Sequence, residues 1–249
     1  EDRVSKNALF IWGGGEPIID RSFEDLLESV LETHTGSQHR FLSNAVRYSE
    51  TVSNLLREGR AQVVTSVDAG SESVFLDVRG RQGFFTVLDN LKKYAGANEH
   101  RVTIKYILTE ANIADGELSS FVKSISEFDL LGCYFQISAN FKTLVLNDQV
   151  TSAALRLFDL LVQAGARFVY VDDLLRIRFI KRASRSMDIF LGFESFARPV
   201  DYGPITVWGA GQIGRLLLED EGFRARWKVK FLIDSTPNLQ GKKIGGIEV

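Results

Sequence analysis

The sequence predicts an α/β fold built on parallel strands, followed by a second, smaller α/β unit. Three observations support this prediction. Short β-rich runs alternate with amphipathic helical runs between residues 8 and 173; a proline-bearing stretch at 193–204 interrupts the pattern; and a new strand followed by a glycine-rich turn begins at residue 205. Because strands that alternate with helices pair in parallel through right-handed crossovers, the first region is expected to form an open sheet or a curled barrel.

The strands are predicted from short runs rich in β-branched and aromatic residues, and the helices from longer runs in which apolar residues recur every three or four positions. Ser22 is the expected N-cap of the first helix, and Gly59 is the expected end of the second. In chain order we expect strand 8–12, helix 22–34, strand 39–45, helix 49–59, strand and turn 61–70, two helical pieces within 71–80 and 83–96, strand 100–109, helix 115–129, strand 132–140, helix 147–165 and strand 166–173.

The regular pattern loosens after Asp173. The stretch "FESFARPVDYGP" holds two of the chain's four prolines, which marks a linker. We therefore expect a first domain at residues 1–196, a linker at 197–204 and a second domain at 205–249. The chain opens at Glu1 without a methionine and stops without a polar tail, so we expect both domains to be cut short relative to a longer protein.

The composition is that of an ordinary water-soluble protein. The 249 residues are 45% hydrophobic and 25% charged, with a net charge of −2. This balance does not favour nucleic acid or an anionic membrane as a partner, and no apolar run approaches the roughly 18 residues that a membrane-spanning helix needs. The single cysteine, Cys133, excludes an internal disulfide framework and suits a reducing compartment, so we expect a cytoplasmic protein.

A glycine fingerprint lies in the second domain, within "ITVWGAGQIGRLLL". Gly209, Gly211 and Gly214 follow a strand and open a helix, and Asp234 ends the next strand. In a Rossmann-type unit these glycines permit a tight turn, a close approach of the backbone to a diphosphate, and helix–strand packing. The second domain resembles nucleotide-binding domains attached to sugar acyltransferases and methyltransferases. This resemblance implies a nucleotide sugar, NAD or S-adenosylmethionine (SAM) as ligand. The alternative is a Rossmann-like unit that binds nothing.

A second glycine run, "GGGEP", follows the strand at 8–12. It lies at a strand's carboxyl end, which is the ligand-binding edge of parallel α/β sheets. Together with "FLSNA", "VVTSVDAGSESVFLDVRGRQGFFTVLDNLKKY" and "RVTIKYILTEAN", in that order, this run resembles the radical SAM superfamily over residues 8 to about 140. The resemblance implies a partial (β/α) radical SAM barrel.

The resemblance assigns a cofactor role to Gly14, Gly15, Glu16 and Pro17. In the family, a G-G-E-P motif holds the amino group of SAM through its backbone and its glutamate. The residue chemistry agrees, because glycines expose backbone groups at close approach and a carboxylate pairs with an ammonium. Pro17 stiffens the turn. The alternative for Glu16 is a solvated loop acid.

The resemblance extends to two further strand ends. Ser43 and Asn44 match the family's "TNG"-like motif, with Ala45 in place of the glycine, a small departure. Asn112 matches a polar position past a later strand, where a helix N-terminal role competes with cofactor binding.

The resemblance also implies that Ser66, Asp68 and Arg79 face SAM. Ser66 and Asp68 stand where the family places polar groups toward the ribose or the carboxylate of the cofactor, and turn or helix capping is the alternative. Arg79 resembles an arginine that pairs with the cofactor carboxylate, and a surface salt bridge is its alternative.

The family's [4Fe–4S] cluster needs three cysteines in C-x-x-x-C-x-x-C spacing, and this chain has only Cys133. Cys133 lies in a predicted strand and is interpreted as a buried apolar residue. We expect the cluster cysteines upstream of Glu1, the alternative being a homologue that never had them. His34, His39 and His100 lack metal-ligand spacing and are interpreted as solvated.

The leading hypothesis is a fragment of a radical SAM enzyme, inactive on its own, whose parent cleaves SAM to a 5′-deoxyadenosyl radical. The resemblance implies a small-molecule or carbohydrate-like substrate and an electron donor such as flavodoxin or ferredoxin. A binding module for a nucleotide or nucleotide sugar on an inactive barrel is the alternative, and an NAD-dependent oxidoreductase is a third. The sequence leaves the substrate and the oligomeric state open.

Overall fold

In the computed structural model the chain forms two compact units, Glu1–Tyr170 and Val171–Val249. The structure describes residues 8–140, 147–172 and 228–249, together with residues 205–208 and the single positions 175, 215 and 218. The predicted linker at 197–204 lies outside these residues, so the predicted domain boundary stays a prediction.

The described elements alternate between strand and helix, as predicted. They are β1 (Leu9–Trp12), the 3-10 helix η1 (Pro17–Ile19), α1 (Phe23–Thr33), β2 (Gln38–Leu42), α2 (Glu50–Arg57), β3 (Ala61–Ser66), α3 (Glu72–Arg79), α4 (Phe84–Asn98), η2 (Glu99–Arg101), β4 (Val102–Leu108), α5 (Asp115–Glu127), β5 (Tyr134–Ala139), α6 (Asp148–Gln163), β6 (Phe168–Val171), β7 (Ile205–Trp208), β8 (Val229–Ile233), η5 (Pro237–Leu239), β9 (Lys243–Ile244) and β10 (Ile247–Glu248).

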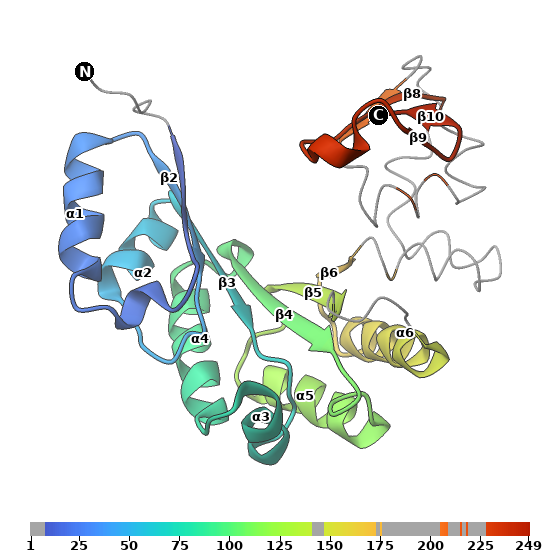
Figure 1. The fold of residues 1–249 in the computed structure, drawn as a ribbon. Helices are drawn as coiled ribbons and strands as arrows, with labels where there is room; N and C mark the ends of the chain where they lie inside the picture. Colours follow the sequence, from blue (N-terminus) through green and yellow to red (C-terminus); the bar gives the residue numbers. More distant parts are fainter. Residues whose placement is uncertain are drawn as a thin grey trace. The chain divides into compact units, whose positions relative to one another are not determined.

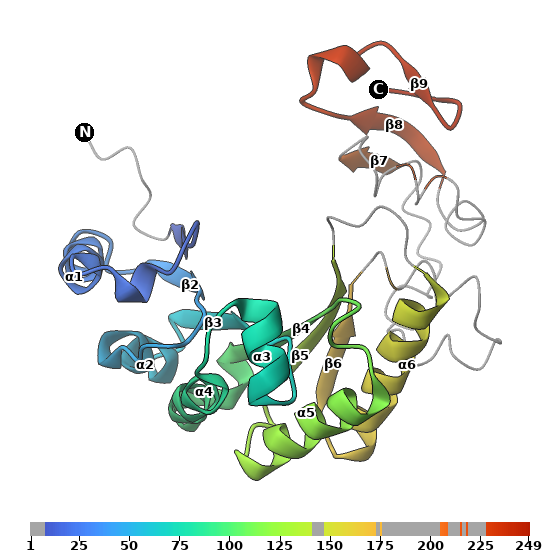
Figure 2. The ribbon, with the colours of Figure 1, turned by 60° about the horizontal axis from the view of Figure 1, so that its bottom comes forward.

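The first unit is built on a six-stranded sheet in the order β1-β2-β3-β4-β5-β6. Strands β1 to β5 pair in parallel with their neighbours. Figures 1 and 2 show helices α1, α2, α4 and α5 on one side of the sheet. The strand order follows the sequence order, as in a barrel that has not closed, and this confirms the predicted α/β class.

Alternation along each strand separates the two faces of the sheet. In β4, Val102, Ile104, Tyr106 and Leu108 are buried, and the Tyr106 ring meets the ring of Phe121 of α5 edge-on at 4.8 Å between centroids. The intervening residues of β4 are only partly buried. We call the face that points away from the helices the inner face; because side chains alternate along a strand, its members follow from the register.

Side-chain caps fix where several helices begin. The hydroxyls of Ser49 and Ser71 and the amide oxygen of Asn147 each accept a backbone N–H from the first turn of α2, α3 and α6. Ser22 stands at the predicted N-cap of α1, but its hydroxyl instead donates to Asp20 Oδ1 at 2.6 Å. The expected boundary was therefore correct, whereas the expected capping bond is absent.

The second unit has a small described core. Strands β7 and β8 pair in parallel, and β9 and β10 form an antiparallel hairpin. Leu218 and Leu232 are buried, and six partly buried apolar residues pack against them: Val207, Val229, Leu239, Ile244, Ile247 and Val249. The parallel pair confirms the two strands predicted around the glycine fingerprint. No helix in the described part of the chain is both long and apolar enough to cross a membrane.

Candidate functional site at the carboxyl ends of the strands

The glycine run leaves β1 at the carboxyl edge of the sheet. Gly14 and Gly15 have φ angles of 89° and 157°, which favour glycine over residues that carry a Cβ. A Cβ at either position would meet nothing within 4 Å. The glycines are therefore suited by backbone conformation rather than by lack of space, and they place Glu16 at the N-cap of η1.

The Glu16 carboxylate crosses from the end of β1 to the end of β2. Ser43 Oγ donates to Glu16 Oε1 at 2.7 Å, and the backbone N–H of Asn44 donates to Oε2. Ser43 is held in turn by the N–H of Ala45, 2.9 Å from its Oγ. Each carboxylate oxygen has capacity for a further donor, so the fixed Glu16 can accept an ammonium group.

Ala45 follows Asn44 in a left-handed backbone conformation. Its φ is 54°, in the left-handed region where alanine carries a conformational cost, and it is fully buried. Its carbonyl accepts an N–H from the buried Asn90 at 2.9 Å. The backbone at Ala45 thus has a conformation that a glycine would adopt more easily.

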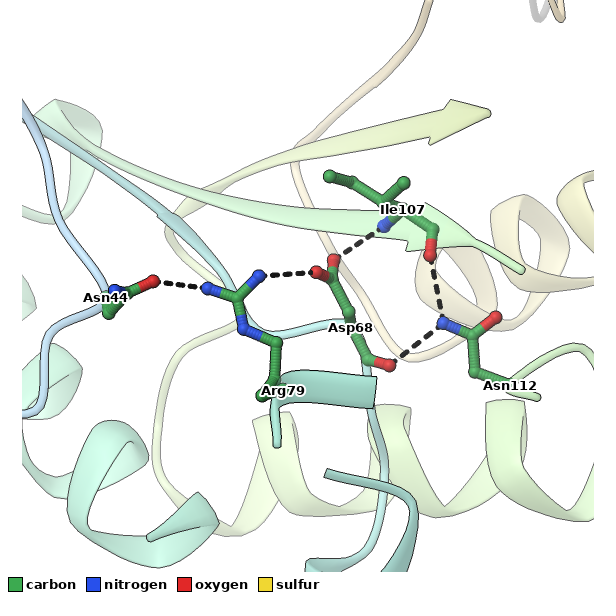
Figure 3. A network of polar contacts seen from close by, with 5 residues as sticks. All are labelled: Asn44, Asp68, Arg79, Ile107 and Asn112. Carbon is green, nitrogen blue, oxygen red and sulfur yellow. Dashed lines mark hydrogen bonds and ion pairs between the residues drawn. The ribbon is translucent and has the colours of Figure 1, made fainter. Parts of the chain in front are cut away.

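A second network links the ends of β2, β3 and β4 (Figure 3). Arg79 Nη1 donates to Asp68 Oδ2 at 3.1 Å, and Arg79 Nη2 donates to Asn44 Oδ1. The other oxygen of Asp68 accepts the N–H of Ile107 at 2.7 Å. Asp68 has only 3% of its side chain exposed and Arg79 22%, so this pair is not the surface salt bridge considered as an alternative.

The side-chain amide of Asn112 is fully hydrogen-bonded within the protein. Its Nδ2 donates to the carbonyls of Asp68 and Ile107, each at 2.9 Å, and its Oδ1 accepts the N–H of Thr109 at 2.7 Å. The side chain is completely buried. Both amide hydrogens are used within the protein, so these contacts support a role in joining the ends of β3 and β4.

Asp68 is electrostatically unusual. Burial raises the pKa of Asp68 to about 6, against the opposing effects of the Ile107 N–H and the Arg79 and Lys105 charges. Its φ of 60° is left-handed, a conformation that aspartate and asparagine tolerate better than most residues. A buried carboxyl with a raised pKa in a strained conformation is typical of functional sites, although structural networks produce the same signature.

Ser66, the last residue of β3, lies on the inner face and is partly buried. Its side chain makes no hydrogen bond with any residue that the structure describes, unlike Ser43 or Asp68. The register pairs Ser66 with Lys105 of β4, and Lys105 with Gln136 of β5. Sequence reasoning selected Ser66 but missed these two neighbours, because only the strand register brings them together.

The inner face of strands β1 to β5 is polar and cationic. Its polar members include two cations and no carboxylate: Gln38, Arg40, Gln62, Ser66, Thr103, Lys105, Tyr134, Gln136 and Ser138. Apolar positions such as Leu9, Ile11 and Leu42 are 60%, 62% and 40% exposed. This face therefore offers both hydrogen-bonding groups and apolar surface.

His39 is not solvated, contrary to the prediction. It is 1% exposed and stacks on the rings of Phe10 and Phe41, with centroids 5.5 and 6.1 Å away. Trp12 Nε1 donates to its Nδ1 at 3.1 Å, and its Nε2 lies 2.8 Å from Ser37 Oγ. Burial, with a smaller contribution from Arg60, lowers the pKa of His39 to about 4, so the ring is a neutral part of the helix-side core.

The [4Fe–4S] cluster does not fit the described residues. Cys133 is fully buried, as predicted, and burial together with Glu99 raises its pKa to about 12, whereas a cluster requires thiolates. No group of three or more histidine, cysteine or acidic side chains in the described part of the chain is arranged to hold a metal ion. These residues therefore supply no cluster ligands.

The nucleotide site predicted in the second unit is only partly visible. Gly209, Gly211 and Gly214 lie outside the described residues. Asp234 directly follows β8, and its Oδ1 accepts the N–H of Thr236 at 2.8 Å. The ligand role of these residues stays a prediction.

No protein-family model and no curated protein matches this sequence. Several solved structures share its fold. One is anSMEcpe with bound AdoMet and the Cp18Cys peptide, at a TM-score of 0.51 and 15% identity over 76% of this chain and 55% of that chain. Another is a domain of pyruvate-formate lyase-activating enzyme from Bacteroides vulgatus ATCC 8482, at a TM-score of 0.50 and 14% identity over 65% of this chain and 97% of that chain.

A radical SAM methyltransferase from Sphaerobacter thermophilus gives a TM-score of 0.47 and 15% identity over 68% of this chain and 51% of that chain. The chain thus spans about half the length of the methyltransferase and of anSMEcpe. At these identities the likeness concerns the fold alone. The likeness to anSMEcpe shows that the six-stranded unit has a partial (β/α) barrel fold.

Proposed function

We propose that this chain is part of a radical SAM enzyme and that the carboxyl rim of β1 to β4 binds SAM. The observation that carries the proposal is the arrangement of Glu16, whose two carboxylate oxygens are held by Ser43 and Asn44 immediately after the Gly14–Gly15 turn. A carboxylate fixed in this way can bind the cofactor's ammonium without first losing conformational freedom. The AdoMet bound to anSMEcpe supports the choice of ligand.

The other rim residues divide into two groups in this proposal. Ser66 and the remaining N–H donors of Arg79 are available to contact the ribose and the carboxylate of SAM. Asp68 and Asn112 hold the rim in place, because most of their polar atoms already have partners within the fold. Pro17, the first residue of η1, stiffens the turn that carries Glu16.

In a radical SAM enzyme, SAM bound at a reduced [4Fe–4S] cluster is cleaved to methionine and a 5′-deoxyadenosyl radical. The described residues do not fit the cluster, so the contribution proposed for them is to bind and orient SAM. The radical reaction, its substrate and an electron donor such as flavodoxin or ferredoxin are proposals for the parent protein.

Calorimetric titration of the chain with SAM, NAD and a nucleotide sugar tests this function. Saturable binding of SAM is the expected result. A lack of SAM binding, combined with tight binding of a nucleotide sugar, would instead favour the binding-module function.

The parallel pair β7–β8, with Asp234 directly after β8, supports a second candidate function. In this proposal the second unit binds a nucleotide or nucleotide sugar at the Gly209–Gly214 turn. Gly211→Trp would then abolish nucleotide binding and leave SAM binding at the first unit unchanged. Equal nucleotide affinity in the variant and the wild type would exclude this turn as the site.

A further inference from the structure

We propose that the inner face holds a subsite for an anionic group of the substrate, a carboxylate or a phosphate, anchored by Lys105. The inference rests on the proposed function, because it names a substrate class for the same partial barrel. It concerns residues that no sequence motif selected, apart from Ser66.

The strand register brings the subsite together. Ser66 of β3 pairs with Lys105 of β4, which pairs with Gln136 of β5, and Ser138 lies one inner-face position beyond Gln136. Neighbouring strands are about 4.8 Å apart, so the Lys105 ammonium and the Gln136 amide lie side by side on one face, next to the Ser66 hydroxyl that the proposed function assigns to SAM. Ser66 is the last residue of β3, at the carboxyl rim, whereas Lys105 and Gln136 lie in the middle of β4 and β5.

The hydrogen bonding of these side chains leaves donors that a ligand can use. Gln136 Nε2 donates to Ser138 Oγ at 3.1 Å, which fixes the amide beside Lys105 and leaves its second N–H as a donor. Ser138 is completely buried, and Ser66, Lys105 and Gln136 are partly buried. A partly desolvated set of donors around an ammonium is suited to a carboxylate or phosphate oxygen.

The charge balance points to the same ligand. Lys105 forms no ion pair with any carboxylate in the described part of the chain, and the inner face of β1 to β5 carries none. The Lys105 charge acts on Asp68, but the Asp68 oxygens already accept the N–H groups of Ile107 and Arg79. A partly buried cation without a close counter-ion is stabilised when a ligand supplies one.

Pyridoxal 5′-phosphate tests the subsite, because its aldehyde forms an imine with a lysine amine and its phosphate requires an anion site nearby. The complete chain is treated with the probe, reduced with borohydride, and mapped by mass spectrometry. Pyridoxal, which lacks the phosphate, is the matched probe. Lys123, 75% exposed on α5, is the internal control. Inorganic phosphate and succinate, at equal ionic strength, are the competitors.

The expected result is that pyridoxal 5′-phosphate labels Lys105 about tenfold faster than pyridoxal does, as a charge-assisted contact implies, whereas Lys123 shows no such preference. Protection by phosphate identifies a phosphate subsite, and protection by succinate identifies a carboxylate subsite. Equal labelling by both probes, or labelling of Lys105 that neither competitor reduces, would overturn the proposal.

A SAM titration of Lys105→Gln separates this inference from the proposed function. Unchanged SAM affinity in the variant is expected, with Lys123→Gln as the matched control. A tenfold weaker affinity would place Lys105 in the cofactor site and overturn the substrate assignment. If the wild type binds no SAM but Lys105 shows the phosphate preference, the anion subsite stands and the proposed function fails.

Discussion

Arg79 holds Asp68 at the carboxyl rim of the sheet, with Arg79 Nη1 3.1 Å from Asp68 Oδ2. The same guanidinium donates to Asn44, whose backbone N–H donates to Glu16. A continuous chain of polar contacts therefore runs from the end of β1 to the end of β4. A change in Arg79 is expected to affect both the stability of the fold and the position of Glu16.

Replacing Arg79 with methionine should destabilise the protein by about 3 kcal/mol, because it leaves the Asp68 carboxylate buried without its cationic partner. Urea unfolding at pH 7 measures the change. Arg57→Met is the matched control, since the Arg57–Glu50 pair has exposed side chains, 51% and 64%, and should contribute less than about 1 kcal/mol. Equal losses in the two variants would contradict the structural role assigned to Arg79.

Asp68 should make stability fall as the pH rises. Its folded pKa of about 6 lies above the ordinary value of 3.8, so the folded state binds the proton more tightly than the unfolded chain does. The stabilisation that comes from this tighter proton binding is fully present below pH 3.8, and it is lost as the pH rises through about 6. The shift corresponds to about 3 kcal/mol.

Asp68→Asn should remove this dependence, and asparagine tolerates the left-handed φ of 60° at this position. Unfolding free energies of both proteins, measured between pH 4 and pH 7.5, give the difference that belongs to Asp68. The wild type should lose stability relative to the variant over this range. Parallel pH profiles would show that Asp68 does not titrate as described.

His39 should remain neutral, with its proton on Nε2, down to about pH 5. Trp12 Nε1 can only donate, so His39 Nδ1 must be the acceptor, and Nε2–H then donates to Ser37 Oγ. Nitrogen chemical shifts from ¹⁵N NMR report both the tautomer and the titration, and His39→Asn identifies the signal. Protonation near pH 6.5 would mean that the ring is not enclosed as the structure shows.

Gly70→Ala should destabilise the protein by about 3 kcal/mol, because a Cβ there would overlap the backbone of α5 at Glu117 and Phe121. Gly96→Ala is the control, since a Cβ on Gly96 meets nothing within 4 Å and alanine is favoured inside a helix such as α4. Thermal or urea unfolding should show a loss for the first variant and a small gain for the second. A neutral Gly70→Ala would mean that α5 packs less closely against the end of β3.

The elements of the first unit could be predicted from the sequence because apolar residues recur at different spacings in strands and in helices. Glycine, serine or asparagine also marks many of the element boundaries. Gly14, Glu16, Ser43 and Asn44 were selected by motif, and the structure brings Glu16 into contact with both Ser43 and Asn44. Which Glu16 oxygen accepts from Ser43 and which from Asn44 depends on the register between β1 and β2, and no local sequence pattern specifies that register.

Two kinds of residue escaped the sequence prediction for physical reasons. His39 is polar and stands at a strand end, but its burial depends on the ring stack that it forms with residues on β1 and β2. Lys105 alternates with apolar residues in β4, as any solvent-facing residue would. Its proximity to Ser66 and Gln136 follows only from the register of three strands.

The most direct test of the SAM site pairs one substitution with two ligands. SAM carries the amino group that Glu16 should bind, and 5′-methylthioadenosine lacks it. We predict that Glu16→Gln weakens SAM binding about tenfold and leaves 5′-methylthioadenosine binding unchanged, while Asp20→Asn, directly after the same 3-10 helix, changes neither. Equal affinities of the wild type and Glu16→Gln for SAM would contradict the assignment of this rim as the SAM site.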